Sequence, residues 1–223
     1  MKRFSTKSYS GQDGYGYGSI YDPEEYLEDR YKKEYVKVEE KIIPMDEFVC
    51  GDFSDNGICS IVAITRVATF YAKNGYDNIP KDYKKNFEKI ISIAEQNGYT
   101  EKKGTPFYKI RKILKCVFEE FGYRNTVLKT SYIWSFDTEV KREIDAGRPV
   151  IMNIARGHYV DHSITVCGYA IFREKDNERT VHRMICVHDG WREKIRFIDY
   201  EDFAYDYLRA GIGSFNLIKR IQK

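Results

Sequence analysis

Residues 56–76 read NGICSIVAITRVATFYAKNGY, and this stretch decides the fold. Residues 58–73 are apolar on most faces, which predicts a buried helix that ends at Gly75. Cys59 lies in the first turn, where the positive end of the helix lowers the pKa of a thiol and raises its thiolate fraction. An inert cysteine inside a core helix gives the same pattern, because cysteine is among the most frequently buried residue types. This segment alone leaves both interpretations open.

Two later segments carry the remaining candidate catalytic groups. Residues 161–170 (DHSITVCGYA) predict a strand that begins at His162, a rigid position for a general base facing a thiol. Residues 184–191 (MICVHDGW) predict a strand that ends at Asp189. If the two strands pair, Asp189 can accept a hydrogen bond from the second ring nitrogen of His162, and Trp191 can shield that bond from water. A structural histidine and an aspartate in an Asp-Gly turn are the alternatives.

The order of these segments, with a cysteine on a helix before a histidine and an aspartate on strands, is more specific than any one of them. Helices are expected first along the chain and a mainly antiparallel sheet after them, which predicts an α+β fold. Further helices are expected over 80–97, 105–121, 137–146 and 200–208, and strands over 126–131, 149–155, 161–172, 180–188, 193–198 and 213–220.

The N-terminal part has a different composition from the rest. Residues 1–20 are rich in Gly, Ser and Tyr without periodicity, which is typical of a loosely docked tail. Residues 22–40 are expected to form a charged helix with Asp22 as its cap. We therefore divide the chain into an N-terminal extension over 1–42 and one catalytic domain over 43–223. The extension either covers the site or binds a partner, and the sequence leaves both open.

Composition excludes several classes of function. The 37 basic and 34 acidic residues give a net charge of +3 without a basic block, so we expect no nucleic-acid partner. No apolar run is long enough for a membrane span, and the N-terminus lacks the pattern of a signal peptide. A cytoplasmic location is the default, with signal-independent export left open. The five cysteines show no zinc-like or disulfide spacing, and we expect no metal and no cofactor.

Several of these segments together resemble a known group. Besides residues 56–76, they are AGRPVIMNI at 146–154, the spacing from His162 to Gly168-Tyr169, and VHDGW at 187–191. They are similar to the papain-like cysteine peptidase superfamily, nearest its bacterial branch related to bacteriocin-processing (double-glycine leader) peptidases. A weaker likeness is to streptopain. The likeness covers about residues 43–220, in pieces.

The resemblance implies a papain-like fold, in which a helical half carrying the nucleophile packs on a mainly antiparallel sheet. It also implies a thiol protease that hydrolyses amide bonds of a peptide or protein through a thioester. Carried over to this chain, Cys59 is the nucleophile, His162 the base and Asp189 the residue that orients it, a catalytic triad. Trp191 is a candidate residue of the cleft.

One departure concerns the oxyanion donor. Relatives place a glutamine several residues before the cysteine, whereas Phe53 lies six residues before Cys59. Asn56 is the candidate oxyanion donor, with Gln12 as an alternative if the tail folds back. The departure keeps two other functions open: a catalytically weak or inactive papain-like binding module, and an acyltransferase of the transglutaminase-like type that uses the same triad.

The other histidines and cysteines are weaker candidates. His158 is a rival base or a metal partner of His162, but it fits the spacing to Gly-Tyr less well. His182 is expected near a hairpin turn, facing solvent. A regulatory disulfide between Cys50 and Cys59 is a minor alternative in a reducing compartment. Two further cysteines are expected as small core residues: Cys167 and Cys186.

Overall fold

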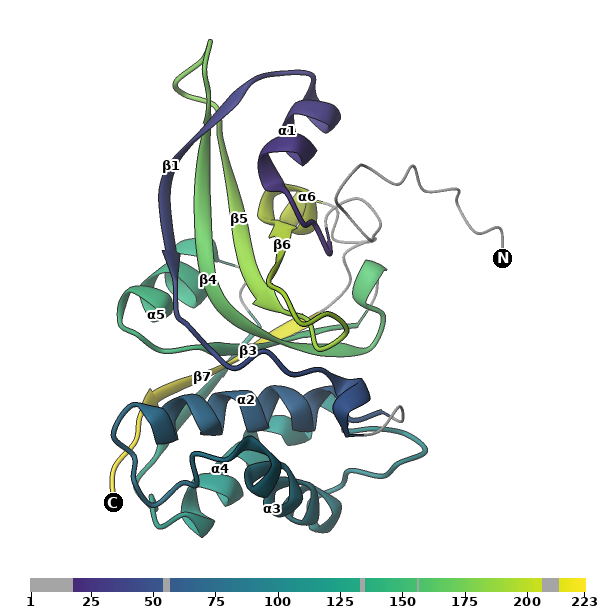
Figure 1. Ribbon diagram of the computed structural model, residues 1–223, viewed down its shortest axis with the longest axis vertical. Coiled ribbons are helices and arrows are strands. Elements are labelled where there is room, and N and C mark those ends of the chain that lie inside the picture. The colour runs from purple at the N-terminus through teal and green to yellow at the C-terminus, as the bar shows by residue number, and fades with distance from the viewer. Residues whose placement is uncertain (1–17, 54–56, 133–134, 156, 206–212) are drawn as a thin grey trace.

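The computed structural model describes residues 18–53, 57–132, 135–155, 157–205 and 213–223. The fold is α+β, with a seven-stranded antiparallel sheet in the order β2-β7-β3-β4-β5-β6 and β1 paired to β4 (Figure 1). The α-helices among the described residues are α1 (Pro23–Tyr31), α2 (Cys59–Lys73), α3 (Tyr83–Gln96), α4 (Ile110–Glu120), α5 (Arg142–Asp145) and α6 (Tyr200–Tyr205). The strands are β1 (Tyr35–Ile42), β2 (Val127–Ser131), β3 (Val150–Ile154), β4 (His162–Glu174), β5 (Val181–His188), β6 (Arg196–Asp199) and β7 (Gly213–Arg220).

Helix α2 is the centre of the helical half. Twelve of its fifteen residues are buried, as the apolar sequence on most faces predicts. It packs against β4 and β3 of the sheet, with α3 and α4 on its far side (Figure 1). The helix ends at Lys73, and Gly75 then adopts φ +93°, a conformation that glycine takes without strain. Cys59 is therefore held at one end of a rigid, buried helix.

Strands β3 and β4 place the second half of the site. All five residues of β3 are buried, because helices cover both faces of the sheet at this point. Ile151 faces the core around α2, whereas Met152 faces the core formed with α5. The first half of β4 pairs with β3, and its second half pairs with β1 beyond a register shift between Val166 and Gly168. His162 is the first residue of β4 and lies opposite Ile154.

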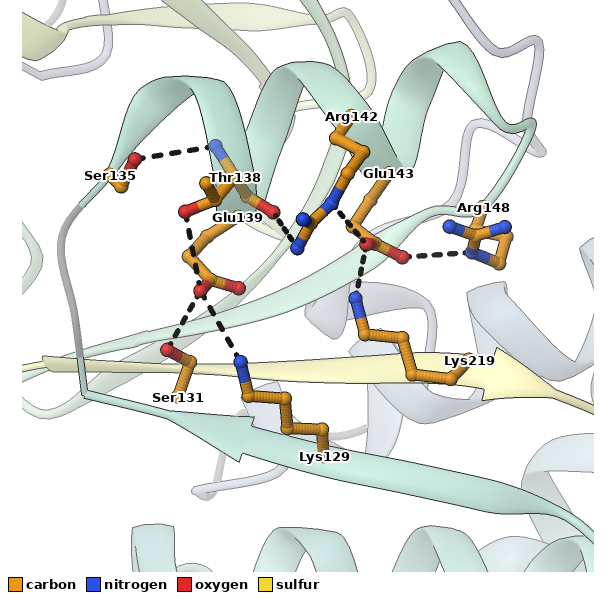
Figure 2. A network of polar contacts seen from close by, with 9 residues as sticks. All are labelled: Lys129, Ser131, Ser135, Thr138, Glu139, Arg142, Glu143, Arg148 and Lys219. Carbon is orange, nitrogen blue, oxygen red and sulfur yellow. Dashed lines mark hydrogen bonds and ion pairs between the residues drawn. The ribbon is translucent and has the colours of Figure 1, made fainter.

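Two buried carboxylates attach the helical turn before β3 to the edge of the sheet (Figure 2). Glu139 lies in the π-helical segment η3 (Phe136–Lys141) and accepts a 3.0 Å bond from Ser131 of β2. Glu143 of α5 accepts from Arg148 at 2.8 Å and pairs with Lys219 of β7. Both carboxylates are almost inaccessible to water, and these partners offset the loss of hydration. The network fixes the α5 side of the sheet.

The N-terminal extension differs from the prediction. A helix over residues 22–40 is wrong for the second half of that range, because α1 ends at Tyr31 and β1 begins at Tyr35. Only the first residue of β1 is buried, so burial imposes no sustained apolar periodicity on the strand. β1 belongs to the same sheet as the rest of the chain, and the domain division at residue 42 stays a prediction.

The fold class and the elements that flank the site are confirmed. The expected helix at 58–73 is α2, and the expected strands at 149–155, 161–172 and 180–188 are β3, β4 and β5 with shifts of a few residues at their ends. Among the described residues, no helix combines the length and apolarity needed to cross a bilayer.

Candidate active site

Cys59 is positioned by a tight approach between two backbone segments. Gly57 has φ +60°, and a Cβ built on it would lie 3.1 Å from the Cα of Gly104. The loop around Gly104 is also held by a 2.7 Å hydrogen bond between the hydroxyls of Ser60 and Thr105. Glycine at position 57 thus allows the chain to turn into α2 directly against this loop. Cys59 follows as the first residue of the helix, partly exposed.

His162 contacts Asp189 from the neighbouring strand. Its Nε2 lies 2.6 Å from the main-chain oxygen of Asp189, and its side chain is only 6% exposed. A carbonyl oxygen can only accept, so Nε2 carries the proton of the neutral imidazole. This tautomer leaves the lone pair of Nδ1 available. The histidine is thereby oriented by a fixed main-chain group.

The pKa of the Cys59 thiol lies below its ordinary value. Burial by itself raises this pKa, but the hydrogen bond to His162 and the charge of His162 lower it. The backbone N–H groups of Ser163 and Ser60 lower it further. These groups stabilise the thiolate, which is the nucleophilic form of cysteine.

The other thiols have a different environment. Burial raises the pKa of Cys50 and of Cys167 to about 12, and it raises that of Cys186 well above its ordinary value. Cys167 and Cys186 are fully buried, as expected for core residues. Among these four cysteines, the thiolate is favoured at position 59, beside the histidine.

Asp189 reaches His162 through an atom that the sequence could not specify. The expected contact involved its carboxylate, whereas the structure uses its main-chain oxygen. The carboxylate Oδ1 instead accepts from the backbone N–H groups of Trp191 at 2.9 Å and Arg192 at 3.0 Å. Oδ2 is buried and has no hydrogen-bond partner among the described residues. The Asp-Gly turn that was an alternative interpretation is present, with Gly190 at φ +75°.

Two aromatic rings lie near the imidazole. The Trp191 ring lies 4.2 Å from the His162 ring at an interplanar angle of 30°, although Trp191 remains 45% exposed. The Tyr159 ring lies 6.0 Å away and nearly parallel, at 9°. Tyr159 is fully buried and precedes β4 in the short helical turn η4 (Gly157–Tyr159). The sequence offered no signal for Tyr159, because it is one of 19 tyrosines in a segment without periodicity.

The other residues considered around the oxyanion site and the base lie in different parts of the chain. Asn56 and Gln12 lie outside the described residues. Phe53 is stacked on Phe87 at 3.9 Å and contacts Phe48 edge to face, so it belongs to the aromatic core of the helical half. The rival base His158 lies in η4, 5.7 Å from the Trp191 ring.

A second group of titratable residues lies elsewhere in the structure. Ligand atoms of His182, Asp199 and Glu201 fall within 4.8 Å of one another, which makes them a candidate metal site. However, Asp199 already accepts from the hydroxyl of Tyr31 at 2.8 Å, and Glu201 is paired with Arg183 at 2.6 Å. The expectation that His182 faces solvent is wrong, because its ring is buried 4.2 Å from that of Tyr31. We interpret this group as the attachment of α1 to the sheet.

The sequence matches the model of the Peptidase C39-like family over residues 45–214. The chain belongs to this family. Membership in the Peptidase C39-like family supports a cysteine peptidase-type family of the papain-like kind and suggests a peptidase-like hydrolase, which implies a peptide or protein substrate. The matched range contains Cys59, His162 and Asp189, and it excludes α1 and β1. No curated protein matches the chain.

Proposed function

We propose that this protein is a cysteine peptidase or amidase that hydrolyses amide bonds through a thioester at Cys59, with His162 as base. The single observation that supports this most is the connected arrangement of Cys59, His162 and the main-chain oxygen of Asp189, with the Cys59 pKa below its ordinary value. A nucleophile within reach of a base, which a third group orients, is the general arrangement for covalent acyl transfer.

The reaction would begin from the thiolate of Cys59 and the imidazolium of His162. The thiolate attacks the substrate carbonyl, and His162 then donates its proton to the leaving amine as the carbon–nitrogen bond breaks. Water, deprotonated by His162, adds to the thioester, and the tetrahedral intermediate expels the Cys59 thiolate and releases the acid, which restores the thiolate and the imidazolium. The main-chain oxygen of Asp189 holds the ring throughout. The backbone N–H of Cys59 and the side chain of Asn56 are our candidates for the oxyanion donors.

The finer assignment within the superfamily also belongs to this proposal. The segments around Cys59 and His162 are most similar to the branch related to bacteriocin-processing peptidases. We therefore propose a peptide substrate that enters as an extended chain. We also keep the cytoplasmic location as a proposal.

Thiol reactivity tests the proposed nucleophile. At pH 6 to 7, iodoacetamide should modify Cys59 well before the other four cysteines, as mass spectrometry of digested protein would show. Cys116 is the matched control, because it is also partly exposed but its thiol donates to the side-chain oxygen of Asn97, at 3.8 Å, and not to a histidine. His162→Ala should reduce labelling of Cys59 to the rate of Cys116. Equal, slow labelling of both in the unmodified protein would contradict the proposal.

One observation favours a second candidate, a papain-like binding module without catalysis. Phe53 packs into the aromatic core at the position where relatives carry an oxyanion glutamine. Cys59→Ala separates the two candidates, because a binding module would keep its biological activity after this change. If the triad acts but the acyl acceptor is an amine, as in transglutaminase-like enzymes, product analysis with added amine would detect the new amide.

A further inference from the structure

Residues 18–20, which we call the N-terminal strap, pass closely over the loop that precedes His162. The backbone N–H of Ser19 donates a 3.0 Å hydrogen bond to the hydroxyl of Tyr159. A Cβ built on Gly18 would lie 2.9 Å from Cε2 of Tyr159 and 3.1 Å from Cδ2 of His158. Only glycine allows so close a contact with the edge of a buried ring. The strap is therefore fitted to η4 rather than lying loosely upon it.

The strap is itself fixed to the sheet. Ile20 donates to the main-chain oxygen of Phe197 at 3.0 Å and accepts from its N–H at 2.8 Å, which makes a two-bond bridge to β6. Ile20 is fully buried in the core that α1 shares with β4 and β5. A segment with two main-chain bonds and a buried side chain offers a rigid support for the Tyr159 hydroxyl.

The imidazole depends on such support because the turn into β4 is not regular. Asp161, directly before His162, has φ +49°, a left-handed conformation that costs energy for a residue other than glycine. Two rings lie beside His162: that of Trp191, which is half exposed, at 4.2 Å, and that of Tyr159, which is buried and nearly parallel to the imidazole, at 6.0 Å. Of the two aromatic residues, Tyr159 is thus the one whose own position is fixed by the protein interior.

We propose that the N-terminal strap and Tyr159 position His162 for proton transfer with Cys59. This inference rests on the proposed function, and it gives part of the extension, outside the family match, a role in the active site. Tyr159 acts through the imidazole and is a positioning residue, not a catalytic one. The hydrogen bond that the Tyr159 hydroxyl accepts from Ser19 fixes the Tyr159 ring, and that ring limits the orientations open to His162.

Tyr159→Phe removes the hydroxyl and leaves the ring. We would measure the rate of Cys59 alkylation by iodoacetamide from pH 5 to 10, together with the thermal midpoint. Loss of the hydrogen bond between the Ser19 N–H and the Tyr159 hydroxyl should lower the alkylation rate of Cys59 at pH 6 by about three- to tenfold. The inflection should move to higher pH, because a displaced imidazolium stabilises the thiolate less, while the plateau at high pH stays unchanged.

Tyr31→Phe is the matched control. It also removes a tyrosine hydroxyl bond that attaches the N-terminal region to the sheet, at 2.8 Å to Asp199, but it does not touch the His162 loop. It should lower the thermal midpoint without moving the inflection. Gly18→Ala is a second test, since the added methyl group must displace the Tyr159 ring and should shift the inflection in the same direction as Tyr159→Phe.

The outcomes separate this inference from the proposed function. If the unmodified protein shows an ordinary thiol inflection for Cys59, the proposed function fails. If the unmodified protein shows the lowered inflection and both Tyr159→Phe and Gly18→Ala retain it, the positioning role is wrong. The same holds if Tyr31→Phe shifts the inflection as much as Tyr159→Phe, because the effect would then follow general destabilisation.

Discussion

Asp189 allows the role of a main-chain oxygen to be separated from that of the carboxylate on the same residue. The main-chain oxygen contacts His162, whereas Oδ1 holds the turn at the N–H groups of Trp191 and Arg192. Asp189→Asn keeps an acceptor oxygen in the side chain and leaves the main chain unchanged. Asp189→Ala removes both turn bonds. We therefore expect the alanine variant to lose much more activity than the asparagine variant.

The size of the difference follows from these two bonds. Each is worth about 1 kcal/mol net, so their loss disfavours the turn that holds Trp191 over His162 by about 2 kcal/mol, or roughly thirtyfold. A neutral amide oxygen keeps both bonds in weaker form, which predicts a decrease of about threefold for Asp189→Asn. Cys59 alkylation at pH 6 and hydrolysis of an unfolded protein substrate such as casein would both report these changes.

Two results would refute this reasoning. Equal losses in the asparagine and alanine variants would mean that the negative charge of Asp189 acts on the imidazole directly. Full activity in Asp189→Ala would mean that the Trp191 turn is not needed. Circular dichroism of both variants serves as the control for folding, because Asp189 is fully buried.

Two further predictions concern stability. Arg66, buried on α2, donates to the main-chain oxygens of Asp46 and Phe48, so Arg66→Met should lower the free energy of unfolding in urea by about 3 kcal/mol; an unchanged midpoint would contradict this. Burial raises the pKa of Asp199, but hydrogen bonds from His182 and Tyr31 lower it more, and the net shift is downward. Its stabilising contribution is therefore present above the unfolded pKa of about 4 and is lost as pH falls through the lower folded value. Asp199→Asn should flatten the decline of unfolding free energy between pH 5 and 2, and an unaltered slope would exclude this role.

The parts of the fold that the sequence predicts well are those where burial imposes a pattern. Helix α2 and strands β4 and β5 are buried along most of their length, so their apolar runs and bounding glycines are visible in the sequence. Strand β1 is exposed over most of its length, and its Lys and Glu residues favour a helical interpretation. What makes it a strand is the free edge of β4, which no local pattern encodes.

The candidate site divides in the same way. The positions of Cys59 and His162 are predictable because each begins a regular element, and their catalytic roles remain a proposal. The contact from Asp189 is made by a main-chain oxygen, which every residue possesses, so the sequence indicates the position but not the atom. Tyr159 and the N-terminal strap meet across 140 residues of chain, a contact between segments that have no periodicity of their own.

That long separation has a consequence for the order in which the protein is made. Ile20 of the strap leaves the ribosome long before its bridge partner Phe197. Cys59, His162 and Asp189 all emerge before β6 is complete. The growing polypeptide therefore contains the proposed reactive residues before it contains the strand that holds the strap, and under the proposed function Cys59 should gain its full reactivity only after β6 has been synthesised.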